Sequence, residues 1–254
     1  MLRIRLVLGV VGMLAIGCGD DDGTDVVTYG DVGVDLDLAE TGTRATETLI
    51  GNLAADSFLA ALQADDVQIT IIGGGGLRCP EELDAVQCEG YVIEAGPVTS
   101  ADLEIVLPFD NELVIKDITG AALLSTLERS VSVIPSERKG WFLHPSETLR
   151  YEADCALTAQ IVDAEGATIE TEGTRVTNVT IAGVALDTGA SYKIATTAFV
   201  AAGGDGHVLL GEASPTTMTG VTERQAIAEY IMTNSPVTPT LDGRIGLTSA
   251  CDVQ

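Results

Sequence analysis

The chain has 254 residues and a formal net charge of −25, with 38 acidic side chains against 13 basic ones. So acidic a chain is expected to avoid nucleic acids and anionic membrane surfaces, because their phosphates would repel it. Without residues 1–17 the chain has 237 residues (254 − 17), which is enough for one large domain, or two small ones, with a sizeable core.

Residues 1–17 have the pattern of an export signal: two arginines precede an apolar run over 6–16 that is too short to cross a bilayer. The run ends in Gly-Cys, which resembles a bacterial lipobox, so we expect Cys18 to be lipidated. A simple secretory signal with a stray cysteine is the alternative. The acidic residues 18–29 are expected to form a solvated tether. These features predict an exported protein of the bacterial cell envelope, attached to a membrane only through its lipid.

The rest of the sequence predicts a mixture of helices and strands. Leucines at helical spacing predict a helix over 46–63, and a β-branched run predicts a buried strand over 67–72 that ends in four glycines. The other expected elements are strands over 103–107 and 113–118, a helix over 120–131, a hairpin over 149–161, strands over 176–181 and 192–199, and a helix over 222–233. This mixture of helices and strands predicts an α+β fold. No shift of composition marks a second domain, so we expect one domain over 30–254.

Four cysteines remain besides Cys18, and an even number in an exported chain predicts two disulfides. Cys79 and Cys88 are close in sequence and are expected to pair, which leaves Cys155 for Cys251. Three connectivities are possible, and the sequence alone does not choose among them. A zinc site is disfavoured because there is no Cys-x-x-Cys motif and the chain has two histidines.

Four segments resemble, in the right order, the C-terminal domain of the 5′-nucleotidases and UDP-sugar hydrolases. They are the helix over 47–56, the Gly-Gly-Gly-Leu-Arg turn over 74–78, the Gly-Pro-Val-Thr and Leu-Pro-Phe-Asp-Asn segments over 96–99 and 107–111, and the Phe-Val-Ala-Ala-Gly-Gly-Asp-Gly segment over 199–206. Each alone is weak because glycine turns are common, but four in the family's order are specific. The resemblance extends from about residue 30 to residue 250.

The resemblance implies an α+β fold with mixed sheets packed between helices, and a binding site for a nucleotide. Phe109 and Phe199 fall on the two phenylalanines that sandwich the base in that family. Arg78 and Asp205 fall on an arginine and a carboxylate that contact the ligand, and Asn111 belongs to the same motif as Phe109. Taken alone, each phenylalanine would more commonly be a core residue. Both stand beside polar, turn-forming residues, which favours a binding site.

The glycine run and the residues around it affect how the phosphate of a nucleotide could be held. Backbone N–H groups at Gly75 and Gly76 are expected to help hold an anion, with a tight turn after the strand as the alternative. Two positions depart from the family: Gly73 replaces an asparagine and Thr46 replaces an arginine. Arg44, two residues before Thr46, is expected to act as a substitute. A nucleoside, a nucleobase or another aromatic ligand therefore remains an alternative to a nucleotide.

The groups that carry the chemistry of full-length 5′-nucleotidases are missing from the pattern. In those proteins a separate N-terminal domain holds two metal ions through aspartates, histidines and an asparagine. This chain has only His144 and His207, without an Asp-x-His or Gly-Asn-His motif. We therefore expect no metal site, no cofactor and no catalytic residue of its own, and a His207 that faces water.

Two functional hypotheses follow from the sequence. The first is a binding module that captures a nucleotide or nucleoside and presents it to a separate metallophosphatase in trans. The second is a structural or interaction lipoprotein of the envelope that has kept the fold and lost the ligand. Retention of both phenylalanines favours the first, and the departures at Gly73 and Thr46 favour the second. Hydrolysis by this chain alone is not expected.

Overall fold

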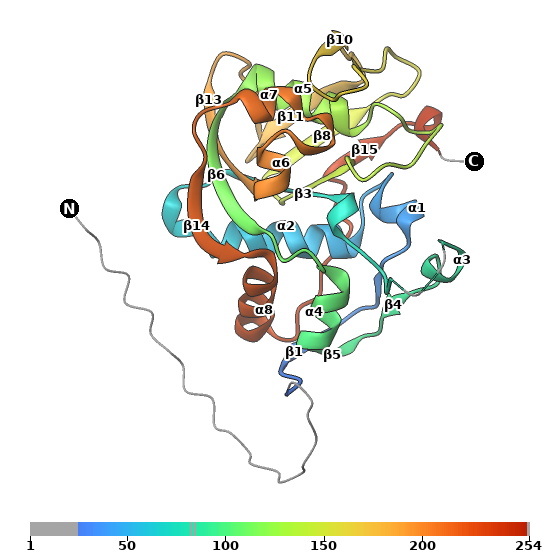
Figure 1. The fold of residues 1–254 in the computed structure, drawn as a ribbon, viewed down its shortest axis with the longest axis vertical. Coiled ribbons are helices and arrows are strands. Elements are labelled where there is room, and N and C mark those ends of the chain that lie inside the picture. The colour runs from blue at the N-terminus through green and yellow to red at the C-terminus, as the bar shows by residue number, and fades with distance from the viewer. Residues whose placement is uncertain (1–24, 82, 84, 253–254) are drawn as a thin grey trace, which may run out of the picture.

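The computed structural model describes residues 25–81, 83 and 85–252, and its fold is α+β, with mixed sheets between helices, as predicted (Figure 1). The expected signal peptide, Cys18 and most of the expected tether lie outside the described residues. Thr28 and Tyr29, which were expected in the tether, are the first residues of a strand. Within the described ranges there is no helix whose length and apolarity would suit a membrane crossing.

A five-stranded mixed sheet with the order β14-β6-β13-β3-β7 forms the centre of the molecule. Its strands are β3 (Ile69–Gly73), β6 (Glu112–Thr119), β7 (Leu143–Pro145), β13 (Ser191–Thr197) and β14 (Thr217–Thr222). β13 runs parallel to β3 and antiparallel to β6. The carboxyl ends of β3 and β13 and the start of β6 therefore meet at one edge of the sheet.

Helices cover the central sheet on both faces. α2 (Leu49–Ala61), α4 (Ser100–Val106) and α8 (Glu223–Asn234) lie in the lower half of Figure 1, and α5 (Gly120–Ser130), α6 (Ala198–Ala201) and α7 (Val208–Glu212) lie above them. Ile72 of β3 packs into the core with α2 and α8, whereas Ile69 and Ile71 pack into the core with α5. Because both faces of β3 are buried, its isoleucines pack into both cores, and the polar residue between them, Thr70, donates its hydroxyl to the Ala55 carbonyl.

A four-stranded sheet with the order β12-β11-β8-β15 packs beside α5. Its strands are β8 (Leu149–Ala153), β11 (Val176–Ile181), β12 (Val184–Ala185) and β15 (Ile245–Leu247). Three strand pairs complete the described sheets: β1 (Thr28–Val32) with β5 (Gly96–Thr99), β2 (Leu36–Asp37) with β4 (Val92–Ile93), and β9 (Ile161–Val162) with β10 (Ile169–Thr171). The short helices are α1 (Glu40–Thr43) and α3 (Ala85–Cys88), and the 3-10 turns are η1 (Gln63–Asp65), η2 (Gly74–Gly76), η3 (Gly204–Gly206) and η4 (Ser249–Cys251).

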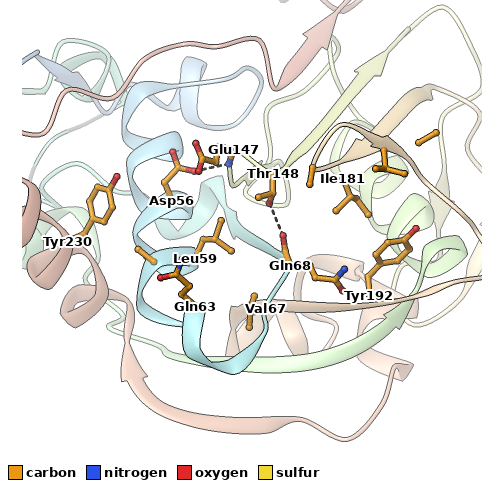
Figure 2. Close-up of a pocket in the computed structure, with 14 residues that line it drawn as sticks. Asp56, Leu59, Gln63, Val67, Gln68, Glu147, Thr148, Ile181, Tyr192 and Tyr230 are labelled. Carbon is orange, nitrogen blue, oxygen red and sulfur yellow. Dashed lines mark hydrogen bonds between the residues drawn. The ribbon is translucent and has the colours of Figure 1, made fainter.

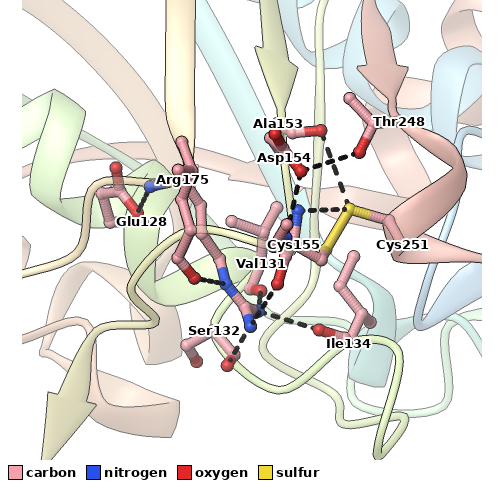
Figure 3. The surroundings of a disulfide bond; sticks show 12 residues. Glu128, Val131, Ser132, Ile134, Ala153, Asp154, Cys155, Arg175, Thr248 and Cys251 are labelled. Atoms are coloured by element: carbon pink, nitrogen blue, oxygen red, sulfur yellow. Dashed lines mark hydrogen bonds between the residues drawn. A yellow bond between two sulfur atoms is a disulfide. The ribbon is translucent and has the colours of Figure 1, made fainter.

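The structure contains the two expected disulfides, Cys79–Cys88 and Cys155–Cys251. Beside the second, the buried Arg175 guanidinium binds a ring of backbone carbonyls (Figure 3). Its donors reach the carbonyl oxygens of Val131, Ser132, Ile134, Cys155 and Leu157. Such a fork-shaped cation satisfies several carbonyls at once where the chain leaves regular structure, so this cluster holds the segment around Cys155, and the disulfide ties Cys251 to that segment.

Three predicted elements differ from the structure. The strand expected over 103–107 is helix α4, because Thr99 and Asp102 form a capping box that starts a helix there. The hairpin expected over 149–161 is absent: β8 pairs with β11 and β15, and β9 pairs with β10 in another sheet. The strand expected over 192–199 ends at Thr197, whose side chain caps α6, so Phe199 is helical. The other expected helices and strands are present within a few residues of their predicted ends.

Candidate functional site

The sheet topology brings the sequence motifs together at one edge. The glycine run follows β3, Phe199 follows β13, and Asn111 immediately precedes β6. Ile194 of β13 pairs with Ile69 of β3 in a parallel register, while Thr197 pairs with Leu113 of β6 in an antiparallel one. Since these three strand ends lie at the same edge of the sheet, segments more than a hundred residues apart in the sequence meet around one opening.

At this edge lies a cavity of about 330 Å³, within the size range of small-molecule sites. The residues that line it are Arg44, Gly75, Gly76, Arg78, Phe109, Asn111, Gly140, Phe199 and Asp205. All eight residues that were predicted to bind the ligand are among them, and Gly140 is the one that was not. The site is therefore a single compact opening assembled from five separate stretches of the chain.

Two exposed aromatic rings stand at the cavity. Phe109 is 58% exposed and Phe199 is 53% exposed, although phenylalanine is among the residues most often buried. The Arg78 guanidinium lies 5.5 Å from the centroid of the Phe109 ring, within cation–π range. The Phe199 ring packs on Gly204, where an added Cβ would lie 2.7 Å from two ring atoms. The protein thus supports both rings from neighbouring groups while leaving much of their surface uncovered.

Cationic side chains surround Asp205 in this otherwise acidic protein. Burial raises the pKa of Asp205, while Arg129, Arg44 and Arg78 oppose that rise through their charges. Burial also lowers the pKa of Arg44, and its ion pair with Glu40 opposes the change. Three cations against two carboxylates leave the site locally positive. An anionic ligand can therefore bind here despite the net charge of the chain, because nearby charges outweigh distant, screened ones.

The glycine run is a closely packed turn. The N–H of Gly74 donates to the Phe142 carbonyl at 2.6 Å, and that of Gly75 donates to the Gly140 carbonyl at 2.8 Å. A Cβ on Gly75 would lie 2.7 Å from the Cα of Gly140, so the two loops touch through their backbones. Of the two N–H groups that were expected to hold an anion, at Gly75 and Gly76, the first is therefore already engaged, which favours the alternative of a tight turn there. The Arg78 Nε donates to the Gly75 carbonyl at 2.7 Å, which orients the guanidinium beside the cavity.

The two histidines are structural. His207 is 1% exposed and burial lowers its pKa to about 3, so the expectation that it faces water was wrong. His144 is fully buried, its Nε2 lies 2.8 Å from the Thr43 carbonyl oxygen, and burial lowers its pKa to about 4. Both rings are therefore neutral near pH 7. Among residues 25–81, 83 and 85–252, no group of three or more histidines, cysteines or carboxylates is placed to hold a metal ion.

A larger hollow of about 740 Å³ lies near the opposite edge of the sheet, beside the starts of β3 and β13 (Figure 2). Tyr192, Tyr230 and Leu59 contribute to its wall, as do the carboxylates Asp56 and Glu147. The described residues that line it include no lysine or arginine, and the Asp56 carboxylate already accepts hydrogen bonds from Arg244. A phosphate-bearing ligand is therefore better accommodated at the cavity with Phe109 and Phe199.

Comparison with known proteins identifies the family to which this fold belongs. Residues 26–212 match the model of the family described as 5′-nucleotidase, C-terminal domain. The chain belongs to this family. The solved 5′-nucleotidase precursor from Thermus thermophilus shares the fold with a TM-score of 0.74 and 30% identity, over 87% of this chain and 39% of that one.

Curated relatives of this 5′-nucleotidase C-terminal domain are much longer proteins. The trifunctional nucleotide phosphoesterase protein YfkN of Bacillus subtilis is 30% identical over 89% of this chain and 14% of its own length. Protein UshA of Yersinia enterocolitica is 27% identical over 83% of this chain and 32% of its own length. The chain thus spans less than a third of either relative.

Several residues that shape the site of this 5′-nucleotidase C-terminal domain were not predicted from the sequence. The Arg129 guanidinium lies 3.8 Å from the centroid of the Trp141 ring, and its Nε donates to the Asp205 carbonyl at 2.9 Å. Arg129 therefore supports Asp205, whose φ of 60° is left-handed. The one available signal was that Trp141 is the single tryptophan of the chain. Its partner could not be inferred, because a basic residue in the last turn of a helix commonly serves the helix alone.

Glu223, at the start of α8, is fully buried behind Asn111. Burial raises the pKa of Glu223 to about 7, and the negative charge of Asp110 adds to the rise. The hydrogen bonds from Asn111 and the positive charge of Arg224 act in the opposite direction. In the unfolded chain the Glu223 carboxyl has its ordinary pKa of 4.5, so the stability that the raised pKa gives to the folded protein is fully present below pH 4.5. That stability is lost as the pH rises through about 7.

We therefore expect the native chain to lose stability relative to Glu223→Gln as the pH rises from 4.5 to 8, by about 3 kcal/mol. Urea unfolding of both proteins across this range would measure the difference, and the glutamine variant serves as the control for every other titrating group. A difference that stayed constant with pH would contradict a raised pKa for Glu223.

Proposed function

We propose that this domain binds a nucleotide or nucleoside, with the base between Phe109 and Phe199 and any phosphate toward Arg78 and Arg44. The observation that carries the proposal is one cavity that combines two half-exposed phenylalanine rings with a cluster of arginines. Stacking on an aromatic side chain contributes about 1–3 kcal/mol per base and suits any base, because every base has a π-face. Asp205 supplies an acceptor for ligand hydroxyl groups.

We further propose that the domain binds its ligand without hydrolysing it and presents it to a metallophosphatase in trans. The relatives named as phosphoesterase and nucleotidase are longer chains, so those activities belong to the whole proteins. Both histidines of this chain are buried, and neither is among the described residues that line the cavity. Purified protein is expected to release no phosphate from AMP or UDP-glucose. Release that EDTA abolishes would contradict the proposal.

We also propose that the protein is exported and anchored in the bacterial cell envelope through a lipid on Cys18. The leader-like residues 1–17 and the acidic residues after them motivate this proposal. The two disulfides support it, because disulfides persist in oxidising compartments outside the cytosol. Mass spectrometry of the membrane fraction is expected to find acyl chains on a new N-terminal cysteine. A mature chain that begins elsewhere would contradict the anchor.

The binding proposal is tested by calorimetric titration of the purified chain with adenosine, AMP, uridine and UDP-glucose. Binding of AMP more tightly than adenosine would show that the arginine cluster recognises phosphate. Equal affinities would indicate that the aromatic clamp acts alone, as the departures at Gly73 and Thr46 suggest. No binding of any of the four would favour the alternative, a structural or interaction protein of the envelope.

A further inference from the structure

Glu223 and Asn111 are joined by three hydrogen bonds. The Glu223 Oε1 accepts from the Asn111 backbone N–H at 3.0 Å and from the Asn111 Nδ2 at 3.2 Å. In return, the backbone N–H of Glu223 donates to the Asn111 carbonyl at 3.0 Å. Glu223 is completely buried at the first turn of α8, where Thr222 caps the helix. The pair therefore forms a fixed connection between α8 and the segment that precedes β6.

This connection determines which way the Asn111 amide faces. A backbone N–H donates to the Glu223 Oε1, so this oxygen is an acceptor whether the carboxyl is ionised or protonated on Oε2. The Asn111 amide must then turn its NH₂ group toward Glu223. Its Oδ1 accepts no hydrogen bond from the described residues, and the side chain lines the ligand cavity. The polar atom that Asn111 offers to a ligand is thus an acceptor.

We propose that Glu223 is a specificity-determining positioning residue: it holds Asn111 so that the site selects bases carrying an amino group on the edge that meets it. The proposal rests on the proposed nucleoside binding at this cavity. A freely rotating asparagine could present either its oxygen or its NH₂ group and would accept bases of both kinds. Fixing the amide removes that freedom, and an unmatched acceptor in a partly buried site penalises a base without a donor.

The test compares adenosine with purine riboside, which has the same ring system without the 6-amino group. The native chain is expected to bind adenosine roughly tenfold more tightly, as the loss of one matched hydrogen bond implies. Glu223→Met has a similar length but only a weakly accepting thioether sulfur, so the Asn111 amide is released and the ratio of the two dissociation constants should fall toward one. Glu223→Gln can still accept through its amide oxygen and should retain most of the native ratio.

Circular dichroism and thermal melting would establish that each variant folds, and Glu223→Ala replaces Glu223→Met if the latter does not. A native ratio of one would overturn the proposal, as would a Glu223→Met or Glu223→Ala ratio equal to the native one. Equal losses of selectivity in the Gln and Met variants would also contradict it, because a merely structural role predicts that pattern. Failure of both nucleosides to bind the native chain would instead overturn the proposed function itself.

Discussion

Phe109→Ala and Phe199→Ala are each expected to weaken nucleoside binding by roughly tenfold to a hundredfold, since each removes one aromatic stacking surface worth about 1–3 kcal/mol. Both rings are more than half exposed, so neither substitution opens a large cavity in the core. The losses should therefore appear in the dissociation constant and leave the unfolding temperature within a few degrees of the native value. Calorimetric titration with adenosine would measure them.

The matched control uses the second hollow. Val184 is 70% exposed and lines the larger hollow near the other edge of the sheet. Val184→Asp should leave adenosine binding unchanged if the ligand lies at Phe109 and Phe199. Phe109→Trp should retain binding, because indole stacks on bases as well as a phenyl ring does. Unchanged affinity in both alanine variants, together with a loss in Val184→Asp, would place the ligand in the larger hollow.

Removal of the Cys155–Cys251 disulfide is expected to destabilise the domain far more than removal of Cys79–Cys88. The first closes a loop of 96 residues and the second a loop of 9. Loop-closure entropy gives about 4–5 kcal/mol for the long loop and about 2–3 kcal/mol for the short one. The long crosslink also lies beside the Arg175 cluster, so its loss loosens neighbouring hydrogen bonds (Figure 3).

Urea unfolding of the Cys155→Ala/Cys251→Ala and Cys79→Ala/Cys88→Ala double variants would measure the two contributions. The short-loop variant is the control for the loss of a crosslink as such. We expect a larger drop in the free energy of unfolding for the first pair. Equal drops, or a larger drop for Cys79→Ala/Cys88→Ala, would show that the C-terminal end is held by packing and not by the crosslink.

The elements that could be predicted from the sequence are those whose signal is local. β3 is a continuous β-branched run that ends in glycines, and α5 has leucines at helical spacing, so both were found close to their actual ends. Helix α4 was misread because its short apolar segment fits either state. The signal that decides for a helix is the capping box of Thr99 and Asp102. The false hairpin arose because strand pairing depends on contacts far away in the sequence.

The residues of the candidate site also divide into those with a local sequence signal and those without one. Most side chains that line the cavity fall in motifs with glycines or turn residues, which the resemblance located, and Arg44 was expected there from its place two residues before Thr46. The groups behind them, Arg129 and Glu223, carry no local signal, because a charged residue on a helix is usually solvated. Their roles depend on which surfaces the fold brings together. Sequence reasoning therefore found the residues that line the cavity and missed what holds those side chains in place.

The proposed position of the base between Phe109 and Phe199 can be observed in a crystal structure of the protein soaked with AMP. We expect the adenine ring to stack against both phenylalanines, with the Asn111 Oδ1 at the base edge and the phosphate near Arg78. AMP bound at the larger hollow, or AMP absent from the cavity at saturating concentration, would contradict the proposed site.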